Sequence, residues 1–406
     1  MQDIFDKTLS SIGLEGKILL AVSGGVDSMC MAYLFLHSKL TGIREGFEIA
    51  HCNFQLRGEE SDGDERMVKE WCLSNGVPFH SKHFDTVGYS KENGISIEMA
   101  ARELRYEWFE SLASLGDFDA VAVAHNANDN AETMLLNLVR GTGLRGITGM
   151  EVVSPLPVSS PKGMLLIRPL LQIPRKDILR CAEENDNPYR EDKTNLSDEY
   201  KRNRIRHKVI PVLEELNPAL LSTLASDMLH FREADAITDD YFFSALDRIL
   251  EKDKDSDKIY GSSAMTIKRD LLAKERFRHF ILHRLMTPCG FTTSQIDSLD
   301  RLVGESADVT FSGKTFIAEG GRVVTGKNII IIYRYAPVSF RKSETLSDVK
   351  VIEGSVEMDI AGPGEYSLDG VRFNVEVMPW KKSMSPKQSE GVIILDQDKA
   401  GFPLHI

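Results

Sequence analysis

Cysteine is scarce in this chain of 406 residues, with thiols only at Cys30, Cys52, Cys72, Cys181 and Cys289. No two of them form a CxxC pair, and they are widely spaced. This usage argues against a disulfide scaffold, and also against zinc or an iron–sulfur cluster held by cysteine. It fits a protein of the reducing cytoplasm, which is the location we expect.

Long hydrophobic runs are also lacking, and no stretch approaches the length of a transmembrane helix. The N-terminal residues 1–7 contain no basic region followed by an apolar stretch, so we expect neither a secretory signal nor a membrane partner. The net charge of −12 speaks against a nucleic-acid partner for the chain as a whole. Residues 201–208 nevertheless carry five positive side chains and a histidine, which leaves a local basic patch open.

The lysine-containing phosphate loop GxxxxGK[ST] is absent, but a different glycine loop is present. An apolar run at 17–20 leads into Ser23-Gly24-Gly25-Val26-Asp27-Ser28, and a second apolar run follows at 29–36. This order predicts a strand, a tight turn and a helix N-terminus, where backbone N–H groups and the helix dipole bind phosphate. The alternative is a plain turn before a core helix.

Asp27 is the unusual member of this loop. A carboxylate beside phosphate groups is repelled unless a divalent cation lies between them. Asp27 is therefore a candidate Mg²⁺ ligand.

Apolar strands alternate with amphipathic helices in the first half of the chain, which predicts an α/β fold with a doubly wound parallel sheet. Ligands of such sheets bind at the carboxyl ends of the strands, where the glycine loop, His51 and His125 fall. The expected strands are 18–22, 47–51, 79–84, 120–124 and 165–170. The expected helices are 28–39, 61–74, 97–115, 129–139 and 175–184.

The pattern changes after Pro211. Helical periodicity predicts a buried face and then a second helical stretch from Ala264 to Leu302. From Val309 short strands and glycine turns prevail, and Asp369-Gly370 before an alternating run predicts a hairpin. We expect a catalytic domain at 1–212, a helical domain at 213–308 and a small β-rich region at 309–406. The expected buried helix face comprises Leu213, Leu216, Leu220, Leu221, Leu224, Met228 and Phe231.

A pair of carboxylates follows the fourth expected strand. Asp129 and Glu132 lie three residues apart, so they share one face near the N-terminus of a helix. Its dipole favours their charged forms, and they could bind Mg²⁺ or the ammonium of an amine substrate. The alternative is an N-terminal cap with a solvated acidic first turn.

Several basic residues are candidate substrate ligands. His51 and Arg57 follow the second strand, where a nucleotide fold commonly meets ribose or base. Arg140 precedes a glycine-rich stretch that suits a mobile phosphate-binding loop, although a plain helix stop is also consistent.

Arg102 and Arg105 lie at i and i+3 on one expected helix. They either pair with the neighbouring Glu98 and Glu103 or face the phosphates of ATP, and the sequence leaves both interpretations open.

Five motifs together carry a resemblance to a known family: SGGVDS at 23–28, HCNFQLRGEESDGDE at 51–65, ARELRY at 101–106, AHNANDNAETMLLNLVRGTGLRG at 124–146 and NRIRH at 203–207. The first resembles the signature loop of the N-type ATP pyrophosphatases of the PP-loop superfamily. In this order, the five resemble the tRNA(Ile)-lysidine synthetase family, and five motifs are far more specific than one. The likeness covers the first half of the chain and continues more weakly beyond it.

The resemblance implies a two-step ligation on an isoleucine tRNA with a CAU anticodon. ATP adenylates the C2 carbonyl oxygen of the wobble cytidine and releases pyrophosphate. The ε-amine of L-lysine then attacks C2, expelling AMP and leaving lysidine. Adenylation makes the oxygen a good leaving group, and the amine needs an acidic residue nearby to take its proton.

The resemblance also implies site roles. Ser23, Gly24, Gly25, Val26, Asp27 and Ser28 would bind ATP, with Mg²⁺ on Asp27. Asp129 and Glu132 would hold the lysine ammonium or the metal, and Arg105 would contact phosphate or the adenylate. Substrate contacts would come from His51, Arg57, His125, Arg140, Arg204 and Arg206.

Two departures from the family pattern stand out. Asn126 occupies a position where relatives often carry a second histidine, so no role for that imidazole carries over. The chain also ends at Ile406 in what reads as a strand, whereas relatives with the larger C-terminal region continue, so we expect a truncation there. A homodimer is left open.

Two other classes are weighed against the ligase. The tRNA cytidine thiolases share the SGGxDS loop but use cysteines, often in CxxC pairs, and none exists here. A nucleotide- or tRNA-binding module without catalysis would not need Asp27, Asp129 and Glu132 around one phosphate site.

Overall fold

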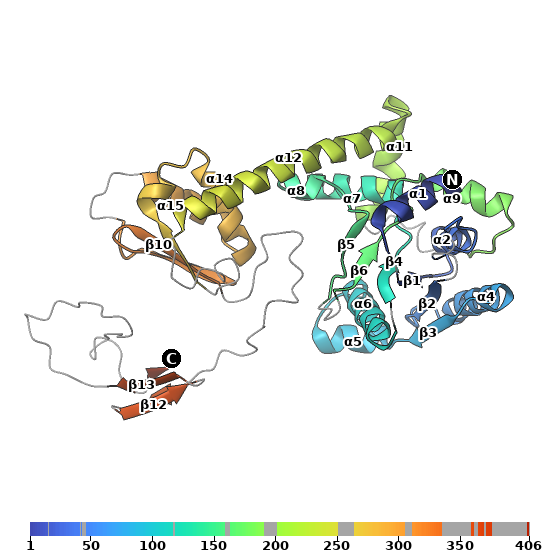
Figure 1. The fold of residues 1–406 in the computed structure, drawn as a ribbon, viewed down its shortest axis with the longest axis horizontal. Helices are drawn as coiled ribbons and strands as arrows, with labels where there is room; N and C mark the ends of the chain where they lie inside the picture. Colours follow the sequence, from blue (N-terminus) through green and yellow to red (C-terminus); the bar gives the residue numbers. More distant parts are fainter. Residues whose placement is uncertain are drawn as a thin grey trace, which may run out of the picture. The chain divides into compact units, whose positions relative to one another are not determined.

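The computed structural model describes residues 1–14, 16–40, 42, 46–116, 118–158, 163–190, 201–250, 264–304 and 311–334, and the strand segments 359–360, 364–368, 371–375 and 404–405. The chain divides into two compact units, Met1–Val349 and Lys350–Ile406, which are described separately (Figure 1). Among the helices of the described residues, none has the length and apolar character to cross a membrane.

The first unit begins with the predicted α/β sheet, which has six strands in the order β3-β2-β1-β4-β6-β5. All neighbours pair in parallel except β5, which runs antiparallel to β6 at the edge. The fold class predicted from the sequence is confirmed. The strands are β1 Lys17–Ala21, β2 Phe47–Asn53, β3 Phe79–His83, β4 Phe118–Ala122, β5 Val153–Pro155 and β6 Leu165–Ile167.

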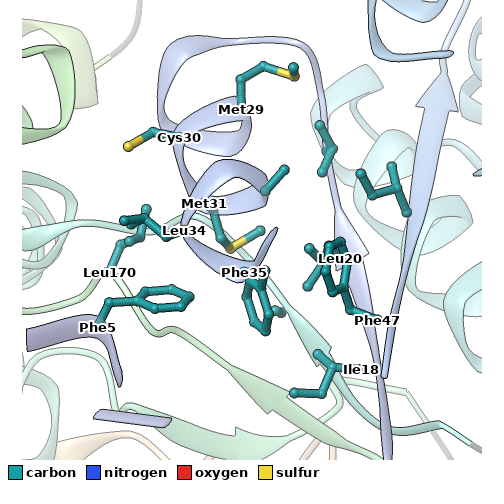
Figure 2. Packing of buried hydrophobic residues seen from close by; sticks show 14 of the residues in the cluster. Phe5, Ile18, Leu20, Met29, Cys30, Met31, Leu34, Phe35, Phe47 and Leu170 are labelled. Atoms are coloured by element: carbon teal, nitrogen blue, oxygen red, sulfur yellow. The ribbon is translucent and has the colours of Figure 1, made fainter. Parts of the chain in front are cut away.

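Helices cover both faces of this sheet, because the central strands are apolar on both sides. Ile18 and Leu20 of β1 belong to the hydrophobic core under α1, α2, α4 and α9 (Figure 2). Leu19 points to the opposite face and packs in the core under α6. The helices are α1 Gln2–Ile12, α2 Val26–Leu36, α4 Glu59–Asn75, α5 Thr86–Asn93, α6 Ile97–Leu115, α7 Ala127–Arg140, α8 Leu144–Ile147 and α9 Arg175–Glu184.

A helical segment follows the sheet and runs beside α7. Its elements are α10 Lys201–Arg204, the π-helix η2 Ile205–Val209, α11 Ile210–Leu216 and α12 Leu220–Ile249. A small core joins it to α7 through Ala131, Ile205, Ile210 and Leu220. This packing sets the position of the basic run at 201–208 relative to the N-terminus of α7.

The predicted buried face of this segment is only partly correct. Leu220 is 7% and Met228 2% exposed, as expected, but Leu216 is 81% exposed. The helix is interrupted at Asn217, whose extended backbone precedes Pro218, so the residues before and after the break do not share one helical register.

The remaining part of the first unit mixes helices with an antiparallel sheet of order β7-β10-β9-β8. The helical prediction for 264–268 is wrong, because Met265 and Ile267 alternate with more exposed residues and the segment pairs with β10. Helices and strands share one core with the end of α12. The elements are β7 Ala264–Lys268, α13 Arg269–Leu272, α14 Arg278–Met286, η4 Thr287–Cys289, α15 Thr293–Gly304, β8 Thr315–Ala318, β9 Gly321–Thr325 and β10 Ile329–Arg334.

The second unit contains two short antiparallel pairs. β12 (Gly364–Leu368) pairs with β13 (Val371–Val375), and Leu368 faces Val371. The predicted hairpin is therefore confirmed, while its turn Asp369-Gly370 lies outside the described residues. β11 (Asp359–Ile360) pairs with β14 (Leu404–His405). The division at 212 and 308 and the expected C-terminal truncation stay predictions.

Candidate active site

The loop Ser23–Ser28, named the phosphate loop here, joins β1 to α2 at the carboxyl edge of the sheet. Two hydroxyls organise it: the Oγ atoms of Ser23 and Ser28 lie 3.2 Å apart, and Ser28 Oγ donates to the Gly25 carbonyl at 2.9 Å. Val26 is 6% exposed and packs into the core, so only its backbone can face a ligand. The N–H groups of the first turn of α2 remain directed at the loop, as an anion site requires.

Gly24 has a conformation that other residues rarely adopt, with φ of +93°. Its carbonyl accepts a hydrogen bond from Arg190 N at 3.0 Å. A Cβ at this position would lie 3.3 Å from Asp64 Cβ and 3.4 Å from Met67 Cε. The turn therefore needs glycine both for its backbone angle and for its close approach to α4.

The substitution Gly24→Ala is expected to lower the free energy of unfolding by about 1–2 kcal/mol, because it places an L side chain at positive φ. Gly25→Ala is the matched control: Gly25 has φ of −75°, and an added Cβ would meet only Ser23 Oγ, at 3.6 Å. Chemical denaturation of both variants measures the difference. Equal losses would show that the positive φ of Gly24 is not what constrains the loop.

Asn126 connects the phosphate loop to α7. Its side-chain oxygen accepts hydrogen bonds from Asn128 N at 3.0 Å and Asp129 N at 3.1 Å, which caps the helix. Its Nδ2 donates to Asp27 Oδ1 at 3.1 Å, and its backbone N–H donates to Asp129 Oδ2 at 3.1 Å. Asn126 is 1% exposed. One buried asparagine thus links Asp27 to Asp129.

Asp27 lies in a partly buried position beside these groups. Burial raises its pKa, Arg175 opposes the shift, and the carboxylate of Asp129 raises the pKa further. The neighbouring carboxylates of Asp27 and Asp129 repel each other, and partial burial removes water from Asp27. Both effects disfavour the charged form of Asp27 unless a cation lies beside it, so the site favours positive charge there.

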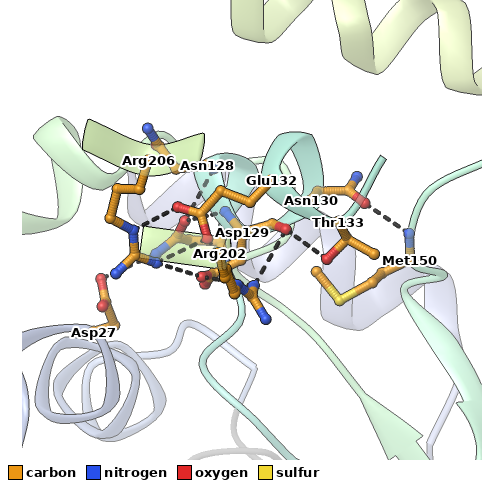
Figure 3. A network of polar contacts seen from close by, with 10 residues as sticks. Asp27, Asn128, Asp129, Asn130, Glu132, Thr133, Met150, Arg202 and Arg206 are labelled. Carbon is orange, nitrogen blue, oxygen red and sulfur yellow. Dashed lines mark hydrogen bonds and ion pairs between the residues drawn. The ribbon is translucent and has the colours of Figure 1, made fainter. Parts of the chain in front are cut away.

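Two arginines from the helical segment neutralise the carboxylates of α7 (Figure 3). Arg206 Nε donates to Glu132 Oε1 at 2.5 Å, and Arg202 Nε donates to Glu132 Oε2 at 2.8 Å. Both guanidinium groups also donate to Asp129 Oδ1, at 3.2 Å from Arg202 and 3.1 Å from Arg206. The Glu132 side chain is 0% exposed and that of Asp129 15% exposed. The acidic first turn is therefore not a solvated cap.

The predicted Mg²⁺ site can be tested against these residues. In the part of the chain that the structure describes, no group of three or more His, Cys, Asp or Glu side chains could hold a metal ion. Mg²⁺ in nucleotide sites commonly takes one or two carboxylates together with substrate phosphates and water. Asp27 beside the phosphate loop fits that smaller donor set.

His51 on β2 and Arg57, in the connection between β2 and α4, lie next to the phosphate loop. His51 is 3% exposed, and its Nδ1 lies 2.8 Å from the Val22 carbonyl, so Nδ1 carries a proton. Burial lowers the pKa of His51. Arg57 pairs with Asp64 at 2.7 Å, and Arg190 pairs with the same carboxylate at 2.7 Å. Asp64 thus holds two arginines next to Gly24.

His125 lies after β4, in a positively charged environment. Burial is the main reason that its pKa falls to about 3. Its buried Nδ1 has no hydrogen-bond partner among the described residues. Four guanidinium groups lower the same pKa, and they belong to Arg168, Arg202, Arg105 and Arg102.

The stability of the protein is expected to fall with pH partly through His125. A histidine whose pKa is depressed in the folded state contributes stability that is present above its unfolded pKa of about 6.5 and is lost as the pH falls toward its folded value. His125→Gln should therefore become more stable relative to the unsubstituted protein as the pH falls from 6.5 to 4. Urea unfolding at several pH values measures this, and a pH-independent difference would contradict it.

The other predicted residues lie farther out. Arg140 is the last residue of α7, so about 16 Å of helix separate it from Asp129, and it is exposed. Arg204 is exposed too, on a different face of its helix from Arg202 and Arg206. The structure does not bring these two arginines into the buried network.

Comparison with known proteins places the chain in a family. The PP-loop domain family matches residues 2–213. A tRNA(Ile)-lysidine synthase of Bacteroides thetaiotaomicron is 36% identical over 326 residues, which are 80% of this chain and 68% of that protein. The synthase of Parabacteroides distasonis is 34% identical over 397 residues, 96% of this chain and 79% of that protein. The chain belongs to the tRNA(Ile)-lysidine synthase family.

The family membership predicted from the five motifs is thereby confirmed. A further tRNA(Ile)-lysidine synthase, from Chlorobaculum tepidum, is 37% identical over 294 residues, 71% of this chain and 82% of that protein. As a member of a PP-loop family, this chain uses ATP.

Four residues of this lysidine synthase family member were missed in the sequence. Asn126 drew attention only as a departure from the family pattern, although an asparagine before a helix is a capping signal. Arg202 was one charge within a basic run, and its spacing of four from Arg206 could have identified a shared face. Arg168 and Arg190 carry no local signal, because only the folded chain brings them to the site.

Proposed function

We propose that the protein is a tRNA(Ile)-lysidine synthase. It would adenylate the C2 carbonyl oxygen of the wobble cytidine in a CAU anticodon with ATP and then join L-lysine through its ε-amine, releasing pyrophosphate and AMP. The observation that carries the proposal is the Asn126 bridge, which holds Asp27 of the phosphate loop and Asp129 of α7 at one sheet edge. A phosphate site and an amine-binding carboxylate at one place suit an adenylation followed by amine attack.

The phosphate loop would take the ATP phosphates through the N–H groups of the first turn of α2 and the hydroxyls of Ser23 and Ser28. Asp27 would hold Mg²⁺, which when bound neutralises charge on the transferring phosphates. Arg206 extends to the same place, because its Nη2 donates to Asp129 Oδ1 at 3.1 Å and its guanidinium lies beside Asp27 in Figure 3. Developing negative charge on the leaving pyrophosphate would thus meet positive groups.

Asp129 is the carboxylate best placed for the lysine ammonium. It stays 15% exposed, and its Oδ2 bonds to the N–H of Asn126. Glu132 is fully buried with both oxygens bound by arginines, so it acts through them as a positioning residue. Arg140 and Arg204 are exposed and would contact the tRNA backbone. The enzyme would act in the cytoplasm.

AMP and pyrophosphate formation with purified protein tests the proposal. The reaction should require ATP, L-lysine and a tRNA(Ile) transcript with a CAU anticodon, and digestion of the product tRNA should yield lysidine. The matched control is the same transcript with a GAU anticodon, which lacks the wobble cytidine. Binding of the CAU transcript without AMP or pyrophosphate formation would indicate a binding module instead of a ligase.

A further inference from the structure

A tight turn at residues 148–150, directly after α8, lies between α7 and the long helix α12. Its central residue, Gly149, has φ of +68°, a backbone angle that favours glycine. A Cβ added there would lie 2.4 Å from Met228 Sδ of α12 and 2.6 Å from Asn130 Oδ1 of α7. The turn therefore touches both helices, and no side chain fits at its centre.

Hydrogen bonds fix this turn to both helices. On one side, Asn130 Oδ1 of α7 accepts a hydrogen bond from Met150 N at 2.6 Å (Figure 3). On the other, Arg232 of α12 donates from Nε to the Thr148 carbonyl at 3.0 Å and from Nη2 to the Met150 carbonyl. Hydrogen bonds from a charged donor are stronger than those between neutral groups. One side chain from each helix thus holds the turn.

The turn acts on the part of α7 that carries the acidic residues of the site. Asn130 follows Asp129 directly in the first turn of that helix. Neighbouring residues of a helix project about 100° apart, so a fixed Asn130 side chain also fixes the direction in which the Asp129 side chain points. Asn130 is 8% exposed, so water does not compete freely for its contact with Met150.

The helix that carries Arg232 is itself held in place. Asp235 and Asp239 follow Arg232 at spacings of three and four residues, so all three share one face of α12. Arg145 of α8 pairs with Asp235 at 3.4 Å and with Asp239 at 3.2 Å. Asp239 also pairs with Arg284 of α14, and the end of α12 packs in the core around that helix. Arg232 therefore acts from a rigid element, as accurate positioning requires.

We propose that Arg232 is a positioning residue for the attack by lysine. It holds the turn at 148–150 against Asn130 and thereby sets Asp129 for the lysine ammonium. The inference rests on the proposed function, in which Asp129 binds that ammonium. A misplacement of about 1 Å caused far from the chemistry can cost a hundredfold in rate. The phosphate loop leads into α2 and not into α7, so we expect Arg232 to affect L-lysine more than ATP.

Three variants of the full chain test this role. Arg232→Gln removes the charged donor from α12, and Asn130→Ala removes the acceptor from α7. Arg232→Lys is the conservative variant, because an ammonium can still donate to a carbonyl of the turn. The matched control is Arg248→Gln on the same helix: Arg248 is exposed, and its Nε donates to Glu275 at 2.7 Å. The measurements are amide hydrogen exchange in α7 and the KM values for L-lysine and ATP.

Arg232→Gln and Asn130→Ala are each expected to speed amide exchange in the first half of α7 by about tenfold, because a hydrogen bond that holds this turn is lost. The KM for L-lysine should rise by about tenfold, while the KM for ATP stays within about twofold of its original value. Arg232→Lys should recover part of both losses. Arg248→Gln should show neither.

Unchanged exchange in α7 of folded Arg232→Gln would overturn the proposal. Faster exchange with an unchanged KM for L-lysine would overturn it too, because the turn would then be a structural contact alone. Equal rises in the KM for L-lysine and for ATP would have the same meaning. The exchange measurement needs no turnover, so it shows whether Arg232 sets α7 even if the unsubstituted protein forms no lysidine. Failure of the proposed function therefore remains distinguishable.

Discussion

Replacing Asp27 with asparagine is expected to reduce tRNA-dependent pyrophosphate release by more than about a hundredfold, because the variant loses the carboxylate proposed to hold Mg²⁺ on the phosphates. The side chain keeps its shape, and Oδ1 can still accept the hydrogen bond from Asn126 Nδ2. The loss should therefore appear in turnover without unfolding. Single-turnover pyrophosphate release measures it.

The same substitution is expected to stabilise the fold at neutral pH. Burial raises the pKa of Asp27 in the folded protein above its ordinary 3.8, so the carboxylate form is disfavoured there. Its contribution to stability is fully present below pH 3.8 and is lost as the pH rises through the folded pKa. The gain in the free energy of unfolding of Asp27→Asn should thus be absent near pH 3.5 and complete at pH 7. Such a gain would show that the charged Asp27 lowers the stability of the unsubstituted protein in exchange for function.

Asp3→Asn provides a control of opposite sign. Asp3 is 74% exposed, and its hydrogen bond with Lys39 lowers its pKa. Its substitution should be neutral or slightly destabilising at pH 7, with normal activity. If Asp27→Asn has a lower melting temperature than the unsubstituted protein at pH 7, burial of that carboxylate is not a stability cost.

Glu132→Gln is expected to lower the free energy of unfolding by about 2–3 kcal/mol. Removing one partner of a fully buried ion pair costs about 3–5 kcal/mol of stability. We expect a smaller loss here because the side chains of the arginines stay partly exposed, 40% for Arg202 and 23% for Arg206, so that water can solvate their unpaired charge. Activity should also fall, because Arg206 loses the carboxylate that holds its Nε. Denaturant unfolding and the AMP assay measure the two effects.

A double-mutant cycle isolates the ion pair. Arg202→Gln alone should cost less, and Glu132→Gln combined with Arg202→Gln should recover part of the stability by removing the excess positive charge. The double variant should stay as inactive as Glu132→Gln if Glu132 acts by positioning Arg206. Additive losses would contradict this coupling. A rise in the KM for lysine alone would show instead that Glu132 contacts the ammonium.

Local patterns were sufficient for most of the sheet. The helix expected at 97–115 is α6 with the same bounds, because Ser96 caps its start and Gly116 follows its end. The central strands β1 and β4 carry apolar side chains that are buried on both faces of the sheet, and the sequence alone predicts such strands from their apolar runs. The segment 264–268 was misassigned because five residues cannot distinguish a helix from a strand, and its partner β10 lies about 60 residues away.

The sequence by itself determined the family, the α/β class and the phosphate loop, because each depends on residues that are adjacent in the chain. Only the tertiary structure decided how the charges are compensated. Asp129 and Glu132 meet arginines 70 or more positions away, and Asn126 meets Asp27 across 99 positions. Electrostatic interactions depend on distance in space, and sequence spacing reveals that distance only within a helix or a strand.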